Sequence, residues 1–345
     1  MALLSRLSAR LQNHPKRIVY PDGEDVRILQ AARQFATRKL GVPILIGDRQ
    51  KIEKNALDND VRMDGIKVIE PLKSDDFPEL LKILRSLPRF KSFEDFEIRE
   101  MAATPSYFAT LMLMTGRADA MLSGATVASS SSLRQIFQLV PLQKNFKTAS
   151  SIMVVSTGNE DLGINGDLFL ADCGVIPEPT EEQLAEIAVT TAMLVRHLTA
   201  RTPRVAMLAY TTKAPTAKVQ SIMKMKAATA LAHQRAQAEN LDMEIDGELQ
   251  ADTAVSPVVA ELKGIKSSVA GKAGVLIFPD LNSGNIASKL LQVMSPSSCY
   301  GQILTGLTKP VAEISRGACV EDIFGTSVIV SAQAVDRKYM SLDEA

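Results

Sequence analysis

The sequence predicts an α/β protein built from two α/β domains with mostly parallel sheets. Short apolar runs typical of buried strands alternate with segments whose apolar residues recur at helical spacing, and this alternation is characteristic of parallel sheets with crossover helices. The chain has 345 residues, whereas single hydrophobic cores seldom grow past roughly 250 to 300 residues. We therefore expect two domains rather than one.

The first part of the chain is predicted to begin with a helix over 1–12 and a strand over 17–20, which ends at a Pro-Asp-Gly turn. An amphipathic helix follows, and further strands are expected at 43–47 and 118–122. Residues 75–116, between these two strands, are predicted to be mostly helical. The first amphipathic helix is expected to carry the apolar residues Val26, Leu29, Ala36 and Leu40 on one face.

A second unit is predicted over 148–280 with strands of its own. Two strands, 151–155 and 168–172, flank a turn rich in Gly, Asn and Asp, which indicates a hairpin-like arrangement. Thr180 and Gln183 form the sequence pattern of a capping box, so a helix should begin there. That helix is expected to bury Leu184, Ile187, Thr191, Leu194 and Leu198. Buried strands at 205–208 and 274–278 and a long helix at 217–241 complete this unit.

Composition excludes several classes of protein. Lys+Arg and Asp+Glu are equal at 39 each, so no overall charge favours nucleic acid or an anionic membrane as a partner. No apolar run reaches the 18 or so residues of a membrane span, and residues 1–12 lack the continuous apolar core of a secretion signal. We expect a soluble cytoplasmic protein that binds neither nucleic acid nor membrane.

The cysteines and histidines give no sign of a metal or redox centre. Cys173, Cys299 and Cys319 share no metal-type spacing, and an odd, sparse count fits a reducing compartment. Cys319 lies close to the Ser-Arg-Gly motif described next, but we interpret it as a small buried apolar residue rather than a nucleophile. No metal site is expected, and no catalytic base is assigned to a histidine.

The most informative motif is Ser315-Arg316-Gly317, followed by Asp322, at the predicted turn into a final helix over 320–334. A guanidinium can bind phosphate oxygens as a fork, a hydroxyl can donate to a developing oxyanion, and a carboxylate can accept a proton. Together these groups suit acyl transfer to an anion. Taken alone, the motif is also a common way to enter a helix.

Other loops that follow predicted strands carry groups suited to ligands, as expected at the carboxyl ends of an open α/β sheet. Ser123-Gly124-Ala125-Thr126 leads into a helix bearing Arg134, and free amides at a helix N-terminus favour anions. The run from Pro279 to Asn285 opens another helix. The segment from Gly306 to Val311 leads into the Ser-Arg-Gly motif.

Along nearly its whole length the sequence resembles the phosphate acetyltransferase family. The resemblance is carried, in this order, by Tyr20-Pro-Asp-Gly-Glu-Asp25, Ala120-Met-Leu-Ser-Gly-Ala125, Ala171-Asp172-Cys173 with the segment to Ala185, Asp246-Gly-Glu-Leu-Gln250, Phe278-Pro-Asp-Leu-Asn-Ser-Gly-Asn-Ile286, Lys309-Pro-Val311 and Ser315-Arg-Gly317. Each motif alone is weakly specific, and their order and separations make the resemblance specific.

The resemblance implies reversible transfer of an acetyl group between coenzyme A and inorganic phosphate, with acetyl-CoA and acetyl phosphate as the acylated partners. It assigns the chemistry to Ser315, Arg316, Asp322 and Arg134. The thiolate would attack acetyl phosphate directly, without a covalent enzyme intermediate, metal or cofactor, because coenzyme A is a substrate. Candidate substrate-binding residues are Ser123, Gly124, Thr126, Arg89, Asn282, Ser283, Gly284, Asn285 and Gly306.

The resemblance also implies the isocitrate/isopropylmalate dehydrogenase-like fold, with the active cleft between two domains and a homodimer as the usual unit. The C-terminal segment of the family returns to the first domain. We therefore assign 1–147 plus 302–345 to domain one and 148–301 to domain two.

Departures from the family pattern fall on expected cleft residues. The family's Leu-Arg-Lys-x-Lys-Gly stretch is Leu87-Pro-Arg-Phe-Lys-Ser92 here, so Pro88 replaces an arginine and Arg89 is the candidate substitute. Thr308 stands where a basic residue often precedes Lys-Pro, and Ala214-Pro215 replaces Gly-Ser. Substrate preference or efficiency could differ as a result.

Three alternatives stay open from the sequence. A phosphate butyryltransferase-like enzyme would run the same reaction on a longer acyl chain. A catalytically silent regulatory domain would share the fold, although such a domain should lack the Arg-Gly pair and the Pro-Asp-Leu-Asn run that are present here. A metal-dependent hydroxyacid dehydrogenase of this fold would need a carboxylate cluster, and none is evident in the sequence.

Overall fold

The computed structural model describes residues 3–214, 218–295 and 297–336, and these divide into two compact units. We call Leu4–Pro141 together with Leu307–Asp336 the N-terminal unit, and Leu142–Gly306 the central unit. The chain thus changes unit after Pro141 and again after Gly306. The sequence-based ranges, 1–147 plus 302–345 and 148–301, place the first change a few residues later and the second a few residues earlier. In the structure, Gly306 lies in the central unit rather than with the C-terminal segment.

The N-terminal unit contains a parallel sheet with the strand order β3-β2-β1-β4-β11. The strands are β1 (Lys16–Tyr20), β2 (Gly41–Ile46), β3 (Lys67–Ile69), β4 (Ala120–Ser123) and β11 (Val311–Glu313). Ile18, Val19 and Tyr20 of β1 are fully buried. Strands buried on both faces are apolar rather than alternating, which is why short apolar runs marked them in the sequence.

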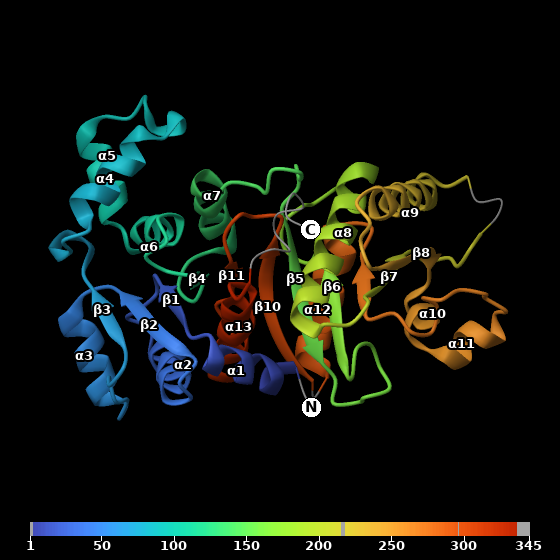
Figure 1. Cartoon of the computed structure of the whole chain (residues 1–345), viewed down its shortest axis with the longest axis horizontal. Helices are drawn as coiled ribbons and strands as arrows, with labels where there is room; N and C mark the ends of the chain where they lie inside the picture. The colour runs from blue at the N-terminus through green and yellow to red at the C-terminus, as the bar shows by residue number, and fades with distance from the viewer. Residues whose placement is uncertain (1–2, 215–217, 296, 337–345) are drawn as a thin grey trace. The chain divides into compact units, whose positions relative to one another are not determined.

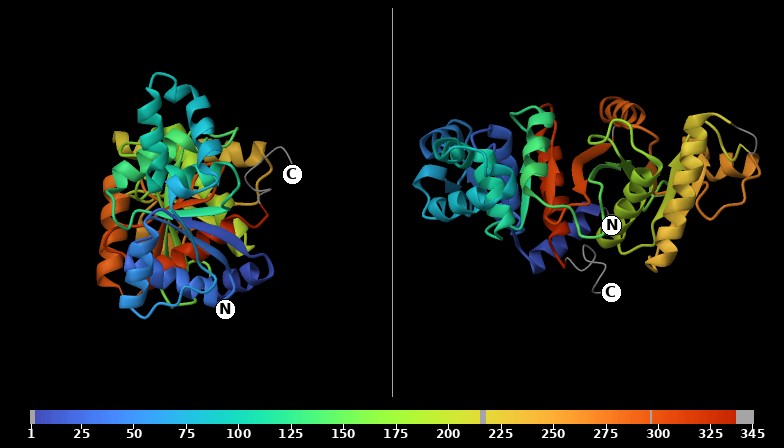
Figure 2. Two further views of the ribbon diagram at one scale, coloured as in Figure 1. Left: turned by 90° about the vertical axis from the view of Figure 1, so that its left-hand side faces the viewer. Right: turned by 90° about the horizontal axis from the view of Figure 1, so that it is seen from above.

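Helices cover both faces of this sheet. Figures 1 and 2 show α2 and α13 on one face and α6 and α7 on the other. The hydroxyl of the buried Tyr20 donates to Ser327 Oγ on α13 at 2.9 Å, and burial raises the pKa of this phenol. The helices of the unit are α1 (Leu3–Asn13), α2 (Val26–Thr37), α3 (Arg49–Asp58), α4 (Phe77–Ser86), α5 (Asp95–Ala103), α6 (Pro105–Met114), α7 (Ser129–Leu139) and α13 (Val320–Gln333), with 3₁₀ turns at Pro71–Lys73 and Pro88–Phe90.

The central unit has a mixed sheet with the strand order β10-β5-β6-β9-β7-β8. Both β10–β5 and β5–β6 are antiparallel, and the remaining pairs are parallel. The strands are β5 (Ser150–Ser156), β6 (Asp167–Ala171), β7 (Arg204–Leu208), β8 (Glu244–Leu249), β9 (Val275–Ile277) and β10 (Ser298–Thr305). The helices are α8 (Glu181–Thr199), α9 (Gln220–Ala238), α10 (Ala251–Val255), α11 (Pro257–Leu262) and α12 (Leu281–Met294).

The predicted fold class, an α/β architecture with mostly parallel sheets, is confirmed. The hairpin of β5 and β6 and the capping box of Thr180 and Gln183 were both predicted correctly. Strands β3, β8, β10 and β11 were not predicted as strands. Leu40, expected on the first amphipathic helix, lies just beyond α2, although it is buried. Over the described residues, no helix has both the length and the apolar character needed to cross a membrane.

Candidate active site

Two of the predicted site loops start side by side at the carboxyl edge of the N-terminal sheet. Strands β4 and β11 are parallel neighbours with Glu313 opposite Ser123. The amide of Ile314 donates to the carbonyl oxygen of Ser123 at 2.8 Å, where both strands end. The sheet therefore brings the loop 123–126 next to the loop 314–319, although almost two hundred residues separate them in the sequence.

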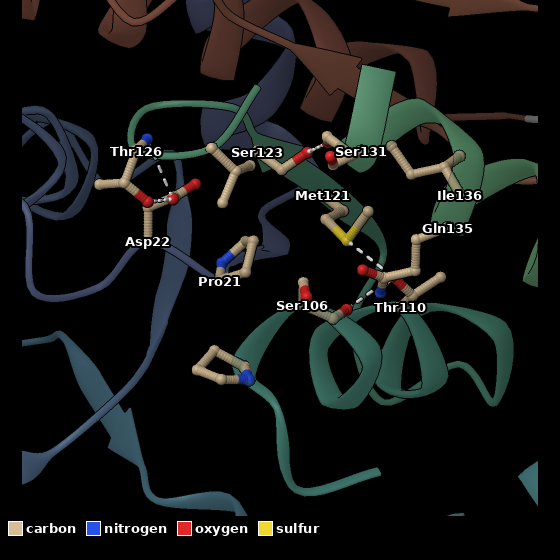
Figure 3. Close-up of a pocket in the computed structure, with 13 residues that line it drawn as sticks. Pro21, Asp22, Ser106, Thr110, Met121, Ser123, Thr126, Ser131, Gln135 and Ile136 are labelled. Atoms are coloured by element: carbon tan, nitrogen blue, oxygen red, sulfur yellow. Dashed lines mark hydrogen bonds between the residues drawn. The ribbon is translucent and has the colours of Figure 1, made fainter. Parts of the chain in front are cut away.

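The strand order also creates a crevice at this edge. From β1 the strand order continues through β2 to β3 on one side, and through β4 to β11 on the other. The order therefore reverses between β1 and β4, and ligands of open α/β sheets bind at such a topological switch point. A cavity of about 220 Å³ lies here. Figure 3 shows Asp22 and Thr126 on one side of it and Met121, Gln135 and Ile136 on the other.

The Asp22 carboxylate accepts hydrogen bonds from the amides of the loop 124–126. Its Oδ2 accepts from the amides of Gly124 at 3.1 Å and Ala125 at 3.4 Å, and its Oδ1 accepts from the amide of Thr126 at 3.2 Å and from the Thr126 hydroxyl. Asp22 is only 8% exposed. The loop amides that were expected to bind a substrate anion are thus bonded to an internal anion.

Gly124 is required by a close backbone approach. Its φ is +104°, and a Cβ added there would lie 2.3 Å from the carbonyl oxygen of Ile314. Only glycine adopts this conformation without strain. The neighbouring Ser123 is buried, and its hydroxyl is hydrogen-bonded to that of Ser132 on α7 at 2.9 Å. Ser123 and Gly124 therefore hold the two loops and α7 together.

Arg27, at the start of α2, connects the same two loops. Its Nη1 donates to the carbonyl oxygens of Arg316 at 2.6 Å and Ala318 at 3.0 Å, and its Nη2 donates to that of Ala125 at 3.0 Å. The Asp25 carboxylate accepts from Nη2 of the same guanidinium at 2.8 Å and from its Nε at 3.1 Å. Burial opposes ionisation of Asp25, but the hydrogen bonds from Arg27 outweigh it and lower the pKa of this carboxyl.

The side chains expected to bind phosphate are exposed. Arg316 lies on the loop after β11 and Arg134 on α7, and both are exposed, while Ser315 is half-buried. In the part of the chain that the structure describes, neither guanidinium forms a hydrogen bond or ion pair. Each retains the full set of donors with which an arginine binds a phosphate.

Asp322 belongs to a capping box at the start of α13. Its Oδ2 accepts from the amide of Cys319 at 3.4 Å, and its own amide donates to Cys319 Sγ at 3.4 Å. No ion pair joins it to Arg316 within the described residues. Asp322 therefore lies at the start of a helix, and its carboxylate is bonded to a main-chain amide.

The prediction that Cys319 is a buried apolar residue is wrong. The thiol is exposed because it serves as the N-cap of α13, at a position where the chain has just left the sheet. Although the residue is exposed, partial desolvation of the sulfur and the nearby Asp322 carboxylate raise the pKa of this thiol. A raised pKa lowers the thiolate fraction at neutral pH, so the interpretation that Cys319 is not a nucleophile is consistent with its environment.

The residues at two departures from the family pattern make local contacts with the main chain. Arg89 donates from Nη1 to the carbonyl oxygen of Phe137, the last turn of α7, at 2.9 Å. Thr308 donates from both its amide, at 2.9 Å, and its hydroxyl, at 3.0 Å, to the carbonyl oxygen of Pro141. Both residues brace the end of the α7 segment. Ala214, the described half of a third departure, donates its amide to Glu248 Oε1 at 2.6 Å, and Pro215 lies outside the described residues.

The remaining candidates lie in the central unit, where Gly284 and Asn285 join the start of α12 to the loop after β6. Asn285 donates to the carbonyl oxygen of Cys173 at 3.0 Å, and a Cβ on Gly284 would lie 2.1 Å from that of Asp172. Ser283 donates its amide to the N-cap Asp280 at 2.8 Å, and Asn282 is exposed. Gly306 approaches Thr148 too closely for any side chain. Apart from Asn282, these residues have clear structural contacts.

A buried carboxylate also organises the loop after β6. Asp172, 4% exposed, accepts from the amides of Ser151, Gly174, Val175 and Ile176, at distances between 2.7 and 3.2 Å. The central unit thus repeats the arrangement of Asp22, with an internal anion in a ring of amides. Among the described residues, no group of three or more His, Cys, Asp and Glu side chains is placed to hold a metal ion.

Comparison with known proteins identifies the family to which this site belongs. The family model described as "Phosphate acetyl/butaryl transferase" matches residues 2–331. The chain belongs to this family. A phosphate acetyltransferase of Acetivibrio thermocellus is 36% identical over 334 residues, which cover 97% of this chain and 98% of the relative.

Solved structures support the same assignment to the phosphate acetyl/butaryl transferases. The EutD phosphotransacetylase from Staphylococcus aureus matches with a TM-score of 0.86 and 33% identity, covering 96% of this chain and 98% of that one. A phosphotransacetylase from Streptococcus pyogenes matches with a TM-score of 0.86 and 30% identity, covering 97% and 99%. A 4-hydroxythreonine-4-phosphate dehydrogenase from Salmonella typhimurium shares the fold alone, at 14% identity and a TM-score of 0.53, over 93% of this chain and 100% of that one.

Sequence reasoning missed the roles of Asp22 and Arg27. Asp22 was noticed only as part of the Pro-Asp-Gly turn and of a family motif, and Arg27 was not noticed. The available signal for Asp22 was an acidic residue directly after a buried strand, beside a glycine, at an edge where helices begin. No signal in the sequence indicates that Arg27 reaches main-chain carbonyl groups almost three hundred residues away.

Proposed function

We propose that this member of the phosphate acetyl/butaryl transferases transfers an acetyl group reversibly between coenzyme A and inorganic phosphate, using the loop 315–317 and Arg134. The residue assignment rests on the main-chain contact and the side-chain exposure of Arg316. Its main chain is fixed by Arg27, with Nη1 and the carbonyl oxygen 2.6 Å apart, while its guanidinium is exposed. Recognition of a phosphate requires a guanidinium whose main chain is fixed and whose donors have no other partner.

In the direction of acetyl-CoA synthesis, the thiolate of coenzyme A attacks the carbonyl carbon of acetyl phosphate. The C–S bond forms, the bond from carbon to the phosphate oxygen breaks, and phosphate leaves with the electron pair. Arg316 and Arg134 hold the phosphate charge. Ser315 donates its hydroxyl to the carbonyl oxygen as negative charge develops there. The reaction needs no resident cofactor, because both the thiol and the phosphate are substrates.

Asp322 is the proposed base for the thiol. A free thiol with a pKa near 8.5 is mostly protonated at neutral pH, so a carboxylate that accepts its proton increases the thiolate fraction. One oxygen of Asp322, Oδ2, is used by the Cys319 amide. Oδ1 is left to accept the proton.

We further propose a homodimer in the cytoplasm, and a surface of the central unit supports the dimer. Helix α12 buries only Gly284 and Ser288 in the described structure. Its opposite side exposes a stripe at helical spacing, with Ile286 at 58%, Leu290 at 53% and Val293 at 83%. An apolar stripe of this kind is typical of a protein interface, and a second copy of this chain is the proposed occupant.

The test is a thioester assay on the purified chain with acetyl phosphate and coenzyme A, run beside butyryl phosphate, with light scattering on the same sample. We expect acetyl-CoA formation with a higher kcat/KM for acetyl than for butyryl phosphate, and the mass of a dimer. No thioester with either substrate would contradict the proposed function and favour a silent domain. A butyryl preference would overturn the acetyl assignment alone. A monomer that is unchanged by Leu290→Glu would overturn the dimer alone.

A further inference from the structure

We propose that Asp22 is a positioning residue for the transfer reaction: its carboxylate acts as a permanent internal anion that holds the loop 124–126 in the shape required by the phosphate-binding arginines. This inference rests on the proposed function. It assigns the loop amides to the protein's own carboxylate and leaves the substrate phosphate to the guanidinium groups.

The hydrogen bonds of Asp22 define the whole loop. Both carboxylate oxygens are engaged, Oδ2 by the amides of Gly124 and Ala125 and Oδ1 by the amide and hydroxyl of Thr126. Successive amides that converge on one anion form a nest, an arrangement of the backbone that binds anions. Because Asp22 is 92% buried, water cannot easily replace the carboxylate.

The loop that Asp22 holds is connected to both proposed phosphate ligands. It leads directly into α7, which carries Arg134, and Gly124 packs against the carbonyl oxygen of Ile314, next to Ser315. Ala125 is also bonded through its carbonyl oxygen to Arg27, which holds the main chain of Arg316. A shift of this loop would therefore displace both arginines relative to Ser315.

The positive charge of Arg27 balances the negative charges of Asp22 and Asp25. Hydrogen bonding to Asp25 is the main cause that raises the pKa of Arg27, and the negative charge of Asp22 contributes to the same shift. Arg27 therefore stays cationic beside a carboxylate pair. Loss of the Asp22 charge would leave a ring of partly positive amides without an anion, at a place where a small exogenous anion could enter.

This consequence allows a test by chemical rescue. Asp22→Ala removes the carboxylate and leaves space, and we expect kcat for acetyl transfer to fall roughly 10- to 100-fold, as a small misplacement of reacting groups does, with KM for coenzyme A nearly unchanged. Sodium formate, which supplies one carboxylate, should restore kcat in a saturable way. Asp22→Asn should lose activity too but resist rescue, because the amide group fills the space and presents donors to the donors of the loop.

Asp119→Ala is the matched control. Asp119 lies at the opposite, amino end of β4 and accepts from the amide of Arg17 at 2.8 Å and from its side chain. We expect this variant to melt at a lower temperature with an unchanged kcat and no response to formate. Wild-type enzyme with formate controls for competition with phosphate. Hydrogen exchange of the amides 124–126 gives a readout that needs no activity: exchange should speed up in Asp22→Ala and slow down again with formate.

The outcomes separate the two proposals. A wild-type chain that forms no thioester contradicts the proposed function, and the exchange measurement then still tests the nest. An active wild type with a fully active Asp22→Ala overturns the inference alone. A loss of activity that formate does not restore, accompanied only by a lower melting temperature as in Asp119→Ala, also overturns it. If Asp22→Ala does not fold, Thr126→Val, which removes only the hydroxyl donor, should reduce kcat without changing KM, and full activity in that variant would overturn the inference.

Discussion

The guanidinium of Arg27 holds the main chain of Arg316, with Nη1 and the carbonyl oxygen 2.6 Å apart. One arginine thus fixes the backbone of another whose side chain is exposed. Because the same group also reaches Ala125, the loop after β4 and the loop after β11 share one support. Precise placement of a catalytic group requires such support from residues that do not themselves touch the substrate.

Arg27→Lys should therefore lower kcat more than it lowers affinity. Lysine retains the charge but cannot donate to several carbonyl groups in the planar geometry of the guanidinium. We expect a loss of roughly 10- to 100-fold in kcat with modest changes in KM. Arg33→Lys, on the same helix and bonded to Asp64 near the protein surface, is the control and should keep wild-type kinetics. Equal kinetics in the two variants would show that the contacts of Arg27 with the two loops do not position the site.

Cys319→Ser should stabilise the enzyme. Sulfur is a weak hydrogen-bond acceptor, whereas serine is among the favoured N-caps, and the capping geometry with Asp322 is already in place. We expect a gain of about 0.5 kcal/mol, measured as a rise in the urea midpoint, with unchanged kcat. Cys319→Ala should change stability in the opposite direction. A large loss of activity in Cys319→Ser would instead indicate that the thiol takes part in the reaction.

Asp25→Asn should change the acid sensitivity of folding. The pKa of Asp25 is lower in the folded state than its ordinary value, so its contribution is complete above the unfolded pKa of about 3.9 and disappears as the pH falls through the lower folded value. Asp25 is also the N-cap of α2. Because asparagine caps a helix about as well as aspartate, the expected loss of about 1 to 2 kcal/mol at pH 7 comes from the charge-assisted hydrogen bonds to Arg27. That difference should shrink when melting curves are repeated below pH 4, and a difference independent of pH would contradict the ion pair.

Local sequence signals predicted those parts of the fold that local physics determines. The capping box of Thr180 and Gln183 depends on side chains three residues apart, and the hairpin of β5 and β6 on a turn between two apolar runs, so both could be identified from the sequence. Strand β11 is short and its partner β4 is far away in the chain, so no local pattern indicated it. Its position nevertheless brings Ser315 and Ser123 to the same edge.

The role of Arg316 and Arg134 in binding phosphate stays a prediction, and the structure shows that both side chains are exposed. The residues that support the site were harder to identify from the sequence. Asp22 and Cys319 take part in main-chain contacts that depend on loop conformation, which the sequence does not specify directly. For the same reason the amides after Ser123 were predicted to bind a substrate anion when they already bind a carboxylate.

Asp322→Asn separates a base from a helix cap by its pH profile. A base is needed most where the thiol is protonated, so the variant should lose activity steeply at pH 6 to 7 and recover part of it toward pH 9, as coenzyme A ionises by itself. The asparagine can still accept from the Cys319 amide, so the cap should persist. An equal loss at every pH, with a lower melting temperature, would leave Asp322 with a structural role only.

The most direct test of the account is kcat/KM for acetyl phosphate in Arg316→Lys, compared with the wild type under the same conditions. If the exposed guanidinium of Arg316 holds the leaving phosphate, removing its fork should cost roughly 2 to 4 kcal/mol of transition-state stabilisation, the range for one preorganised donor. The main-chain bond to Arg27 is unaffected by this change, so the loop should keep its place. A variant with near-normal kcat/KM would contradict the central claim that acyl transfer takes place at this loop.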